Sequence, residues 1–124
     1  MPRILIIDDD ESVRYILRET LRGAGYEIDE AHNGREGLQR YRATPAHLVI
    51  TDIFMPEKDG LETIQELRHD FPYVKIIAMS GNWGSHDMVQ PLGVQSTLRK
   101  PFDLQELLAV VQAVVRARSD AATM

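Results

Sequence analysis

The chain contains no cysteine, so it can form neither disulfide bonds nor thiolate metal sites. It also lacks any apolar run approaching the roughly 18 residues that a membrane-spanning helix needs. Positive charge is scarce: 14 Lys and Arg against 19 Asp and Glu leave a net charge of -5, which argues against a nucleic-acid ligand. No signal peptide is visible before the first strand-like run, and we therefore expect a cytoplasmic protein.

Apolar runs without polar alternation are the main feature that the sequence does contain. Its 124 residues and 44% hydrophobic content are ordinary for one globular domain. Three runs are typical of strands buried on both faces of a sheet: Ile4–Ile7, Leu48–Ile50 and Val74–Met79. Two more polar segments are typical of edge strands: Glu27–Ala31 and Thr97–Arg99.

Between these strands lie segments in which apolar residues recur at helical spacing. The periodic positions are Val13, Ile16, Leu17 and Leu21; Leu38 and Tyr41; Leu61, Ile64, Leu67 and Phe71; and Leu104, Leu107, Leu108, Val111 and Val115. Asp10 and Asp103 suit the N-cap positions of the first and last helices, the last running from Asp103 to about Arg118. The weakest helical segment is a short one near Ser85–Leu92.

Strands and helices therefore alternate, which predicts an α/β domain with a parallel sheet covered on both faces. The polar second and fifth strands would lie at the two edges of the sheet, and the three apolar ones inside it. This arrangement fits a flavodoxin-like (βα)5 doubly wound fold with strand order 2-1-3-4-5.

Acidic side chains stand at the ends of two neighbouring buried strands. Asp8 and Asp9 follow the first strand, and Asp52 ends the third. Ligands of such sheets bind where the strand order switches, which is between these two strands. Three carboxylates this close would repel one another unless a cation lay between them. Oxygen ligands favour magnesium or a similar ion such as manganese.

A hydroxyl and a lysine follow the remaining two strands at the same edge of the sheet. Ser80 ends the fourth strand, and Lys100 follows the fifth. Magnesium commonly shares its coordination shell with phosphate oxygens. Lys100 and the metal would neutralise charge on a phosphoryl group in transfer, and Ser80 would donate a hydrogen bond to it. The pattern favours Asp52 as a nucleophile that forms an acyl phosphate.

Taken together and in order, these motifs resemble the receiver domain of bacterial two-component response regulators. The likeness is to the single-domain kind related to the chemotaxis regulator, and it extends from Arg3 to about Arg118. The matching motifs are Ile6-Ile7-Asp8-Asp9-Asp10, Asn33-Gly34, Asp52-Ile53-Phe54-Met55-Pro56, Asp59-Gly60, Ser80 and Lys100-Pro101-Phe102. We expect one receiver domain over residues 1–124, with a core over 3–118 and a frayed tail at 119–124.

The resemblance implies a role for each residue of the cluster. Asp52 would be the phosphoacceptor, and Ser80 and Lys100 would contact the phosphoryl group. The Lys100–Pro101 peptide bond would be cis. The metal ligands would be the carboxylates of Asp9 and Asp52, the backbone carbonyl of Phe54 and, through a bound water, Asp8.

The resemblance also implies a switch rather than an enzyme that acts on separate substrates. The phosphoryl donor would be a phosphohistidine on a sensor histidine kinase or a histidine phosphotransfer protein. Phosphorylation would alter the Ser85–Arg118 face, which would bind a downstream protein or a second copy of the chain. Neither direct nucleic-acid binding nor membrane insertion is expected.

Two positions depart from the family pattern. Thr97 stands where receivers usually carry an aromatic switch residue, three positions before the lysine, and Gly81 stands where alanine is usual. The phosphorylation chemistry is unaffected, but a threonine cannot fill and vacate a pocket as a ring does. We therefore expect activation to be visible mainly between Gly81 and Leu92, with Trp83 as a reporter.

Three other interpretations stay open at this point. A haloacid-dehalogenase-like phosphatase would use Asp8 as nucleophile and Asp10 as general acid, but it leaves Asp52 without a role. Asp10 is better explained as a helix cap. An interaction module that works without phosphorylation would fit Thr97. The chain would also have this sequence if it were the receiver portion of a longer regulator.

Overall fold

The computed structural model describes residues 1–55, 60–81 and 85–117, the side chains of Ser85 and His86 excepted. Within these ranges the chain forms β1 (Arg3–Ile7), α1 (Glu11–Gly23), β2 (Glu27–Ala31), α2 (Gly34–Ala43), β3 (Leu48–Asp52), α3 (Gly60–Asp70), β4 (Ile76–Ser80), α4 (Ser85–Val89), the 3-10 helix η1 (Gln90–Leu92), β5 (Ser96–Arg99) and α5 (Leu104–Arg116). The predictions for Pro56, Asp59, Trp83 and the tail at 119–124 lie outside the described residues.

The strands form one parallel sheet in the order β2-β1-β3-β4-β5, which confirms the predicted topology. β1, β3 and β4 lie inside the sheet, and every residue of β3 and β4 is buried. The polar strands β2 and β5 form the edges, where one strand neighbour is missing. All five strands therefore end at the same edge of the sheet, because parallel strands share one direction.

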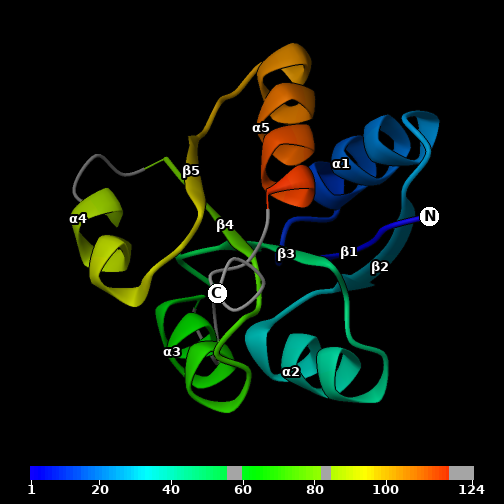
Figure 1. Cartoon of the computed structure of the whole chain (residues 1–124). Coiled ribbons are helices and arrows are strands. Elements are labelled where there is room, and N and C mark those ends of the chain that lie inside the picture. Colours follow the sequence, from blue (N-terminus) through cyan, green and yellow to red (C-terminus); the bar gives the residue numbers. More distant parts are fainter. Residues whose placement is uncertain (56–59, 82–84, 118–124) are drawn as a thin grey trace.

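Helices cover both faces of this sheet (Figure 1). Leu17 and Leu21 of α1 and Leu107 and Val111 of α5 form one core with the inward residues of β1, β3 and β4. On the other face, α2, α3 and α4 cover a second core that includes Tyr41, Ile64 and other apolar residues. None of the helices in the described ranges has the length and hydrophobicity that crossing a membrane requires.

Side-chain caps fix where three helices begin. Asp10, Asn33 and Asp103 each accept a hydrogen bond from a backbone N–H of the first turn that follows. The caps at Asp10 and Asp103 confirm the sequence prediction. Gly25 has φ +99° just after α1, a left-handed conformation that glycine adopts without strain.

The predicted apolar stripes are only partly buried. Leu104 of α5 is 45% exposed, so the expectation that the periodic positions of the last helix all belong to the core is wrong there; Ile16, a periodic position of α1, is 48% exposed. Val114, which was not predicted, is buried, whereas Leu108 and Val115 are only partly so. The reason is that a helix lying on a sheet buries only a narrow stripe, and apolar residues beside that stripe stay in contact with solvent.

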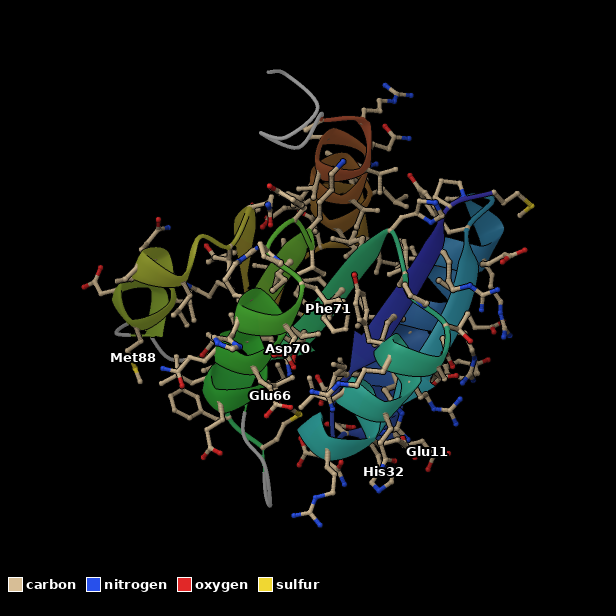
Figure 2. All side chains as sticks on the ribbon, turned by 60° about the horizontal axis from the view of Figure 1, so that its bottom comes forward. Glu11, His32, Glu66, Asp70, Phe71 and Met88 are labelled. Carbon is tan, nitrogen blue, oxygen red and sulfur yellow. The ribbon has the colours of Figure 1, made fainter. Side chains whose placement is uncertain are left out.

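Ion pairs and an aromatic contact connect α2 to α3. Arg42 of α2 donates hydrogen bonds to Glu66 and Asp70 of α3 at 2.6 and 2.8 Å, and both carboxylates are labelled in Figure 2. Tyr41 meets the ring of Phe71 edge to face, with ring centroids 4.7 Å apart. Exposed ion pairs contribute little to stability, so the packing of apolar side chains contributes most to the contact between α2 and α3.

Gly60 allows α3 to start directly against the end of β3. Its N–H donates to the carbonyl of Ile53 at 2.7 Å. A Cβ at this position would lie 1.9 Å from the carbonyl oxygen of Asp52 and 2.6 Å from the Cα of Ile53. No side chain fits there unless α3 moves away from the strand that carries Asp52.

We predict that Gly60→Ala destabilises the protein by at least about 2 kcal/mol, because backbone atoms cannot yield as a flexible side chain can. Gly23→Ala is the control, since nothing lies within 4 Å of a Cβ there. The control should be neutral or stabilising by up to about 1 kcal/mol, the helix preference for alanine. Urea denaturation measures both, and equal effects of the two substitutions would contradict the close approach at Gly60.

Candidate functional site

Three carboxylates meet at the carboxyl edge of the sheet. β1 pairs with β3 in a register that sets Ile7 beside Thr51, so Asp8 and Asp9 come next to Asp52. One carboxylate oxygen from each of these acids lies within 4.8 Å of the others. Asp8 is fully buried, Asp52 is 8% exposed, and Asp9 is exposed to solvent. The tertiary structure therefore brings together the three acids that the sequence analysis singled out.

Lys100, which directly follows the edge strand β5, reaches this cluster from that edge of the sheet. Its Nζ donates a hydrogen bond to Asp8 Oδ2 at 2.8 Å and lies 3.5 Å from Asp52 Oδ2. The backbone N–H of Lys100 donates to the carbonyl of Ser80 at 2.9 Å, which extends the pairing of β4 and β5. The Lys100–Pro101 peptide bond is cis, as predicted.

The remaining predicted site residues lie at the same edge. Ser80 is the last residue of β4 and is buried. Phe54 follows Asp52 by two residues, and its side chain is exposed. Among the described residues, a Cβ at Gly81 would meet only the carbonyl oxygen of Lys100, at 3.9 Å, so the alanine usual in the family would fit against them. The roles assigned to Ser80 and to the Phe54 carbonyl stay predictions.

Burial and charge set the protonation of the central acid. Burial raises the pKa of Asp52 to about 6, even though the charge and hydrogen bond of Lys100 and the N–H of Ile53 lower it; the charge of Asp8 adds to the rise. Burial lowers the pKa of Lys100, but its hydrogen bond and charge interactions with Asp8 and Asp52 outweigh this and raise that pKa overall. At neutral pH, Asp52 is therefore mostly a carboxylate and Lys100 an ammonium group.

The acids suit a hard divalent cation. Two carboxylates with little contact with water share the charge of one lysine, and a third, on Asp9, faces them from solvent. A cation bound by these oxygens would offset the burial and the smaller repulsion by Asp8 that raise the pKa of Asp52. Oxygen donors of this kind, with room on the solvent side for water, are what magnesium prefers.

The carboxylate of Asp10 takes no part in the cluster. Its Oδ1 accepts hydrogen bonds from the N–H groups of Ser12 and Val13 at 2.8 and 3.4 Å, as the N-cap of α1. The phosphatase interpretation needs Asp10 as a general acid beside Asp8. The capping bonds instead hold this carboxylate at the helix end.

The sequence analysis missed two features beside the cluster. Arg14 donates a hydrogen bond to the backbone carbonyl of Asp8 at 2.6 Å. In the sequence, the only indication of this contact was the position of Arg14 near the start of α1, close to Asp8. A cavity of about 350 Å³ next to Lys100 is lined by residues of α1 and of the segment after β5: Val13, Ile16, Lys100, Pro101, Phe102 and Leu104. Ile16 and Leu104, the two exposed residues among the periodic positions, lie in this lining.

Solved structures share both the fold and the strand order. Chemotaxis protein CheY4 of Vibrio cholerae is 29% identical, with a TM-score of 0.86 over 92% of this chain and 98% of that one. Response regulator protein TrrA of Thermotoga maritima, solved in complex with Mg²⁺-BeF, is 35% identical, with a TM-score of 0.86 over 92% of this chain and 99% of that one. The molecule is thus a doubly wound α/β domain of the kind related to the chemotaxis regulators.

Sequence comparison gives the family. The model of the response regulator receiver domain matches residues 4–112, so the chain belongs to the receiver domains of two-component response regulators. Response regulator MprA of Mycolicibacterium vanbaalenii is 37% identical over 116 residues, which are 92% of this chain and 50% of that protein. The chain therefore spans about half the length of the curated relatives that it matches.

The raised pKa of Asp52 predicts a pH-dependent stability. A carboxyl whose folded-state pKa lies above its unfolded value of 3.8 destabilises the native state above both values, and this penalty fades as the pH falls through about 6 to below 3.8. Without metal, Asp52→Asn should therefore be more stable than the parent by about 1–3 kcal/mol at about pH 7.5 and equally stable near pH 4. Urea denaturation in chelator measures this, and a difference that does not change with pH would contradict it.

Proposed function

We propose that this domain is a phosphorylation switch in which Asp52 accepts a phosphoryl group from a phosphohistidine donor. The observation that carries the proposal is the place of Asp52: a nearly buried carboxylate at a strand end, with Lys100 at 3.5 Å and Asp8 and Asp9 beside it. Membership of the receiver family supports the same assignment.

Magnesium, or manganese in its place, would be held by the carboxylates of Asp9 and Asp52 and by the backbone carbonyl of Phe54, with Asp8 acting through a bound water. The bound cation would neutralise charge on the phosphoryl oxygens. The geometry of the three acids supports this ligand set. The Thermotoga maritima relative in complex with Mg²⁺-BeF supports it by analogy.

In the transfer step, an Asp52 carboxylate oxygen attacks phosphorus in line with the phosphorus–nitrogen bond of the donor histidine. That bond breaks, the new oxygen–phosphorus bond gives an acyl phosphate, and the imidazole leaves with the electron pair. The Lys100 ammonium group lies where it would pair with an equatorial phosphoryl oxygen, and the Ser80 hydroxyl would donate to another. With a pKa of about 6, Asp52 is available as a nucleophile at neutral pH.

The donor would be a sensor histidine kinase or a histidine phosphotransfer protein. The apolar cavity bounded by Ile16, Phe102 and Leu104 lies directly beside Lys100, so it supplies a surface on which such a donor would rest. Histidine kinases take their phosphate from cellular ATP, so we expect the domain to act in the cytoplasm. Activity would be confined to accepting the phosphoryl group and losing it by hydrolysis, rather than turning over a separate substrate.

The output surface would be the face of α4, β5 and α5, which would bind a downstream protein or a second copy of the chain. Thr97 stands on β5 in place of the usual aromatic switch. This departure is the observation that favours the second candidate, an interaction module that works without phosphorylation. We propose a single receiver domain for residues 1–124, either by itself or as part of a longer regulator.

The phosphorylated residue decides between the switch and the phosphatase. Incubation with acetyl phosphate and magnesium, borohydride trapping of the acyl phosphate and mass spectrometry locate the label. We expect it on Asp52, lost in Asp52→Asn and kept in Asp10→Ala, because Asp10 caps α1 and does not reach the cluster. Label on Asp8, or turnover of phosphate esters that persists in Asp52→Asn, would refute the switch.

Magnesium should stabilise the native protein through Asp9. A ligand that binds only the native state adds about 2.7 kcal/mol at roughly a hundred times its dissociation constant, which raises the melting temperature. Asp9→Ala should abolish this increase, while Glu11→Ala, an exposed acid on the first turn of α1 (Figure 2), should keep it. If Asp9→Ala keeps the full magnesium response, Asp9 is not a direct ligand.

A further inference from the structure

Arg14 forms the contact on which this inference rests. Its Nη1 donates a hydrogen bond to the backbone carbonyl of Asp8 at 2.6 Å, and its Nε lies 3.4 Å from Oε1 of Glu30 on β2. The side chain of Arg14 is only 16% exposed. The guanidinium group of Arg14 thus connects α1 to the end of β1 and to the edge strand β2.

Every polar group of Asp8 has a partner. Its N–H donates to the carbonyl of Ala31 at 3.1 Å, Oδ1 accepts from the N–H of Asp10 at 2.9 Å, and Oδ2 accepts from Lys100 at 2.8 Å. Arg14 supplies the fourth contact, to the backbone carbonyl. Asp8 is therefore held in one orientation by bonds to β2, α1 and the segment after β5.

The carbonyl that Arg14 binds belongs to the peptide group that joins Asp8 to Asp9. This group is planar, so the direction of the Asp8 carbonyl fixes where the nitrogen and Cα of Asp9 lie. Asp9 is exposed, and its carboxylate is the least confined of the three acids. Its distance from Asp52 therefore depends on the backbone that carries it, and Arg14 holds that backbone.

Glu30 holds Arg14 in turn. Glu30 pairs with Ile6 in the register of β1 and β2, one residue before the strand end. Its other oxygen, Oε2, accepts a hydrogen bond from Nη1 of Arg18 at 2.7 Å. Arg14 and Arg18 are four residues apart on α1 and share this carboxylate, but it is Arg14, which lies nearer the cluster, that contacts Asp8.

We propose that Arg14 is a positioning residue for the metal site: it orients the Asp8–Asp9 peptide group so that both carboxylates face Asp52. The inference rests on the proposed function, since it presupposes that the acids bind magnesium. The role needs arginine, because its planar group can reach two acceptors at once whereas a lysine ammonium group is a single point charge.

Arg14→Met and Arg18→Met form a matched pair of variants. Each loses a guanidinium group and an ion pair with Glu30, but only the first loses the hydrogen bond to Asp8. Titration calorimetry with magnesium chloride should show an affinity about 10-fold weaker in Arg14→Met, the usual effect of removing a group that orients a metal ligand. Arg18→Met should stay within about twofold of the parent.

Acetyl phosphate labelling of Asp52 adds a readout that a purely structural role would not reproduce. In Arg14→Met, the labelling rate should fall at low magnesium and recover at saturating magnesium, because only the occupancy of the metal site is affected. A maximal rate that stays low at saturation would overturn the inference.

The outcomes separate this inference from the proposed function. If the parent binds magnesium and the two methionine variants bind it equally well, Arg14 has no positioning role, while the proposed function stands. If the parent binds no magnesium, both fail. Should Arg14→Met not fold, Glu30→Ala, which frees Arg14 without removing it, should also weaken magnesium binding. An unchanged affinity in Glu30→Ala would then overturn the inference.

Discussion

The pairing of one lysine with two largely buried carboxylates is the interaction on which the site depends. Lys100 stands 2.8 Å from an oxygen of Asp8 and 3.5 Å from one of Asp52. A charge left uncompensated in such a place would be costly, so the strand ends that carry these groups must stay in register. Because β5 lies at the edge and β1 on the far side of β3 and β4, the ion pair spans the sheet.

The same pairing leaves the cluster short of positive charge. Asp8, Asp52 and the nearby Asp9 together outnumber the single ammonium group, and burial, to which the charge of Asp8 adds, raises the pKa of Asp52 to about 6 despite the nearby Lys100. A divalent cation bound at these oxygens would compensate the excess of negative charge. Backbone contacts keep the carboxylate oxygens close despite their repulsion. Gly60 lies against the backbone of Asp52, and Arg14 donates a hydrogen bond to the backbone carbonyl of Asp8.

The sequence motifs of the receiver family are present around the acids, whereas β5 departs from the family pattern. β5 carries Thr97, and within the described residues α4 covers Ser85–Val89 and is followed by η1. Arg68 of α3 donates hydrogen bonds to the carbonyls of Leu92 and Gly93 at 3.1 and 3.0 Å, which ties the end of η1 to α3.

Local pattern determined the strands, the helix caps at Asp10 and Asp103, and the acids at the strand ends, because apolar periodicity and capping chemistry depend on near neighbours in the chain. The order of the sheet followed from which strands were polar. Only the tertiary structure decided that Ile16 and Leu104 face solvent. Only it brought Arg14 onto the carbonyl of Asp8, because that contact depends on how α1 packs against β1 and β2, which no local spacing records.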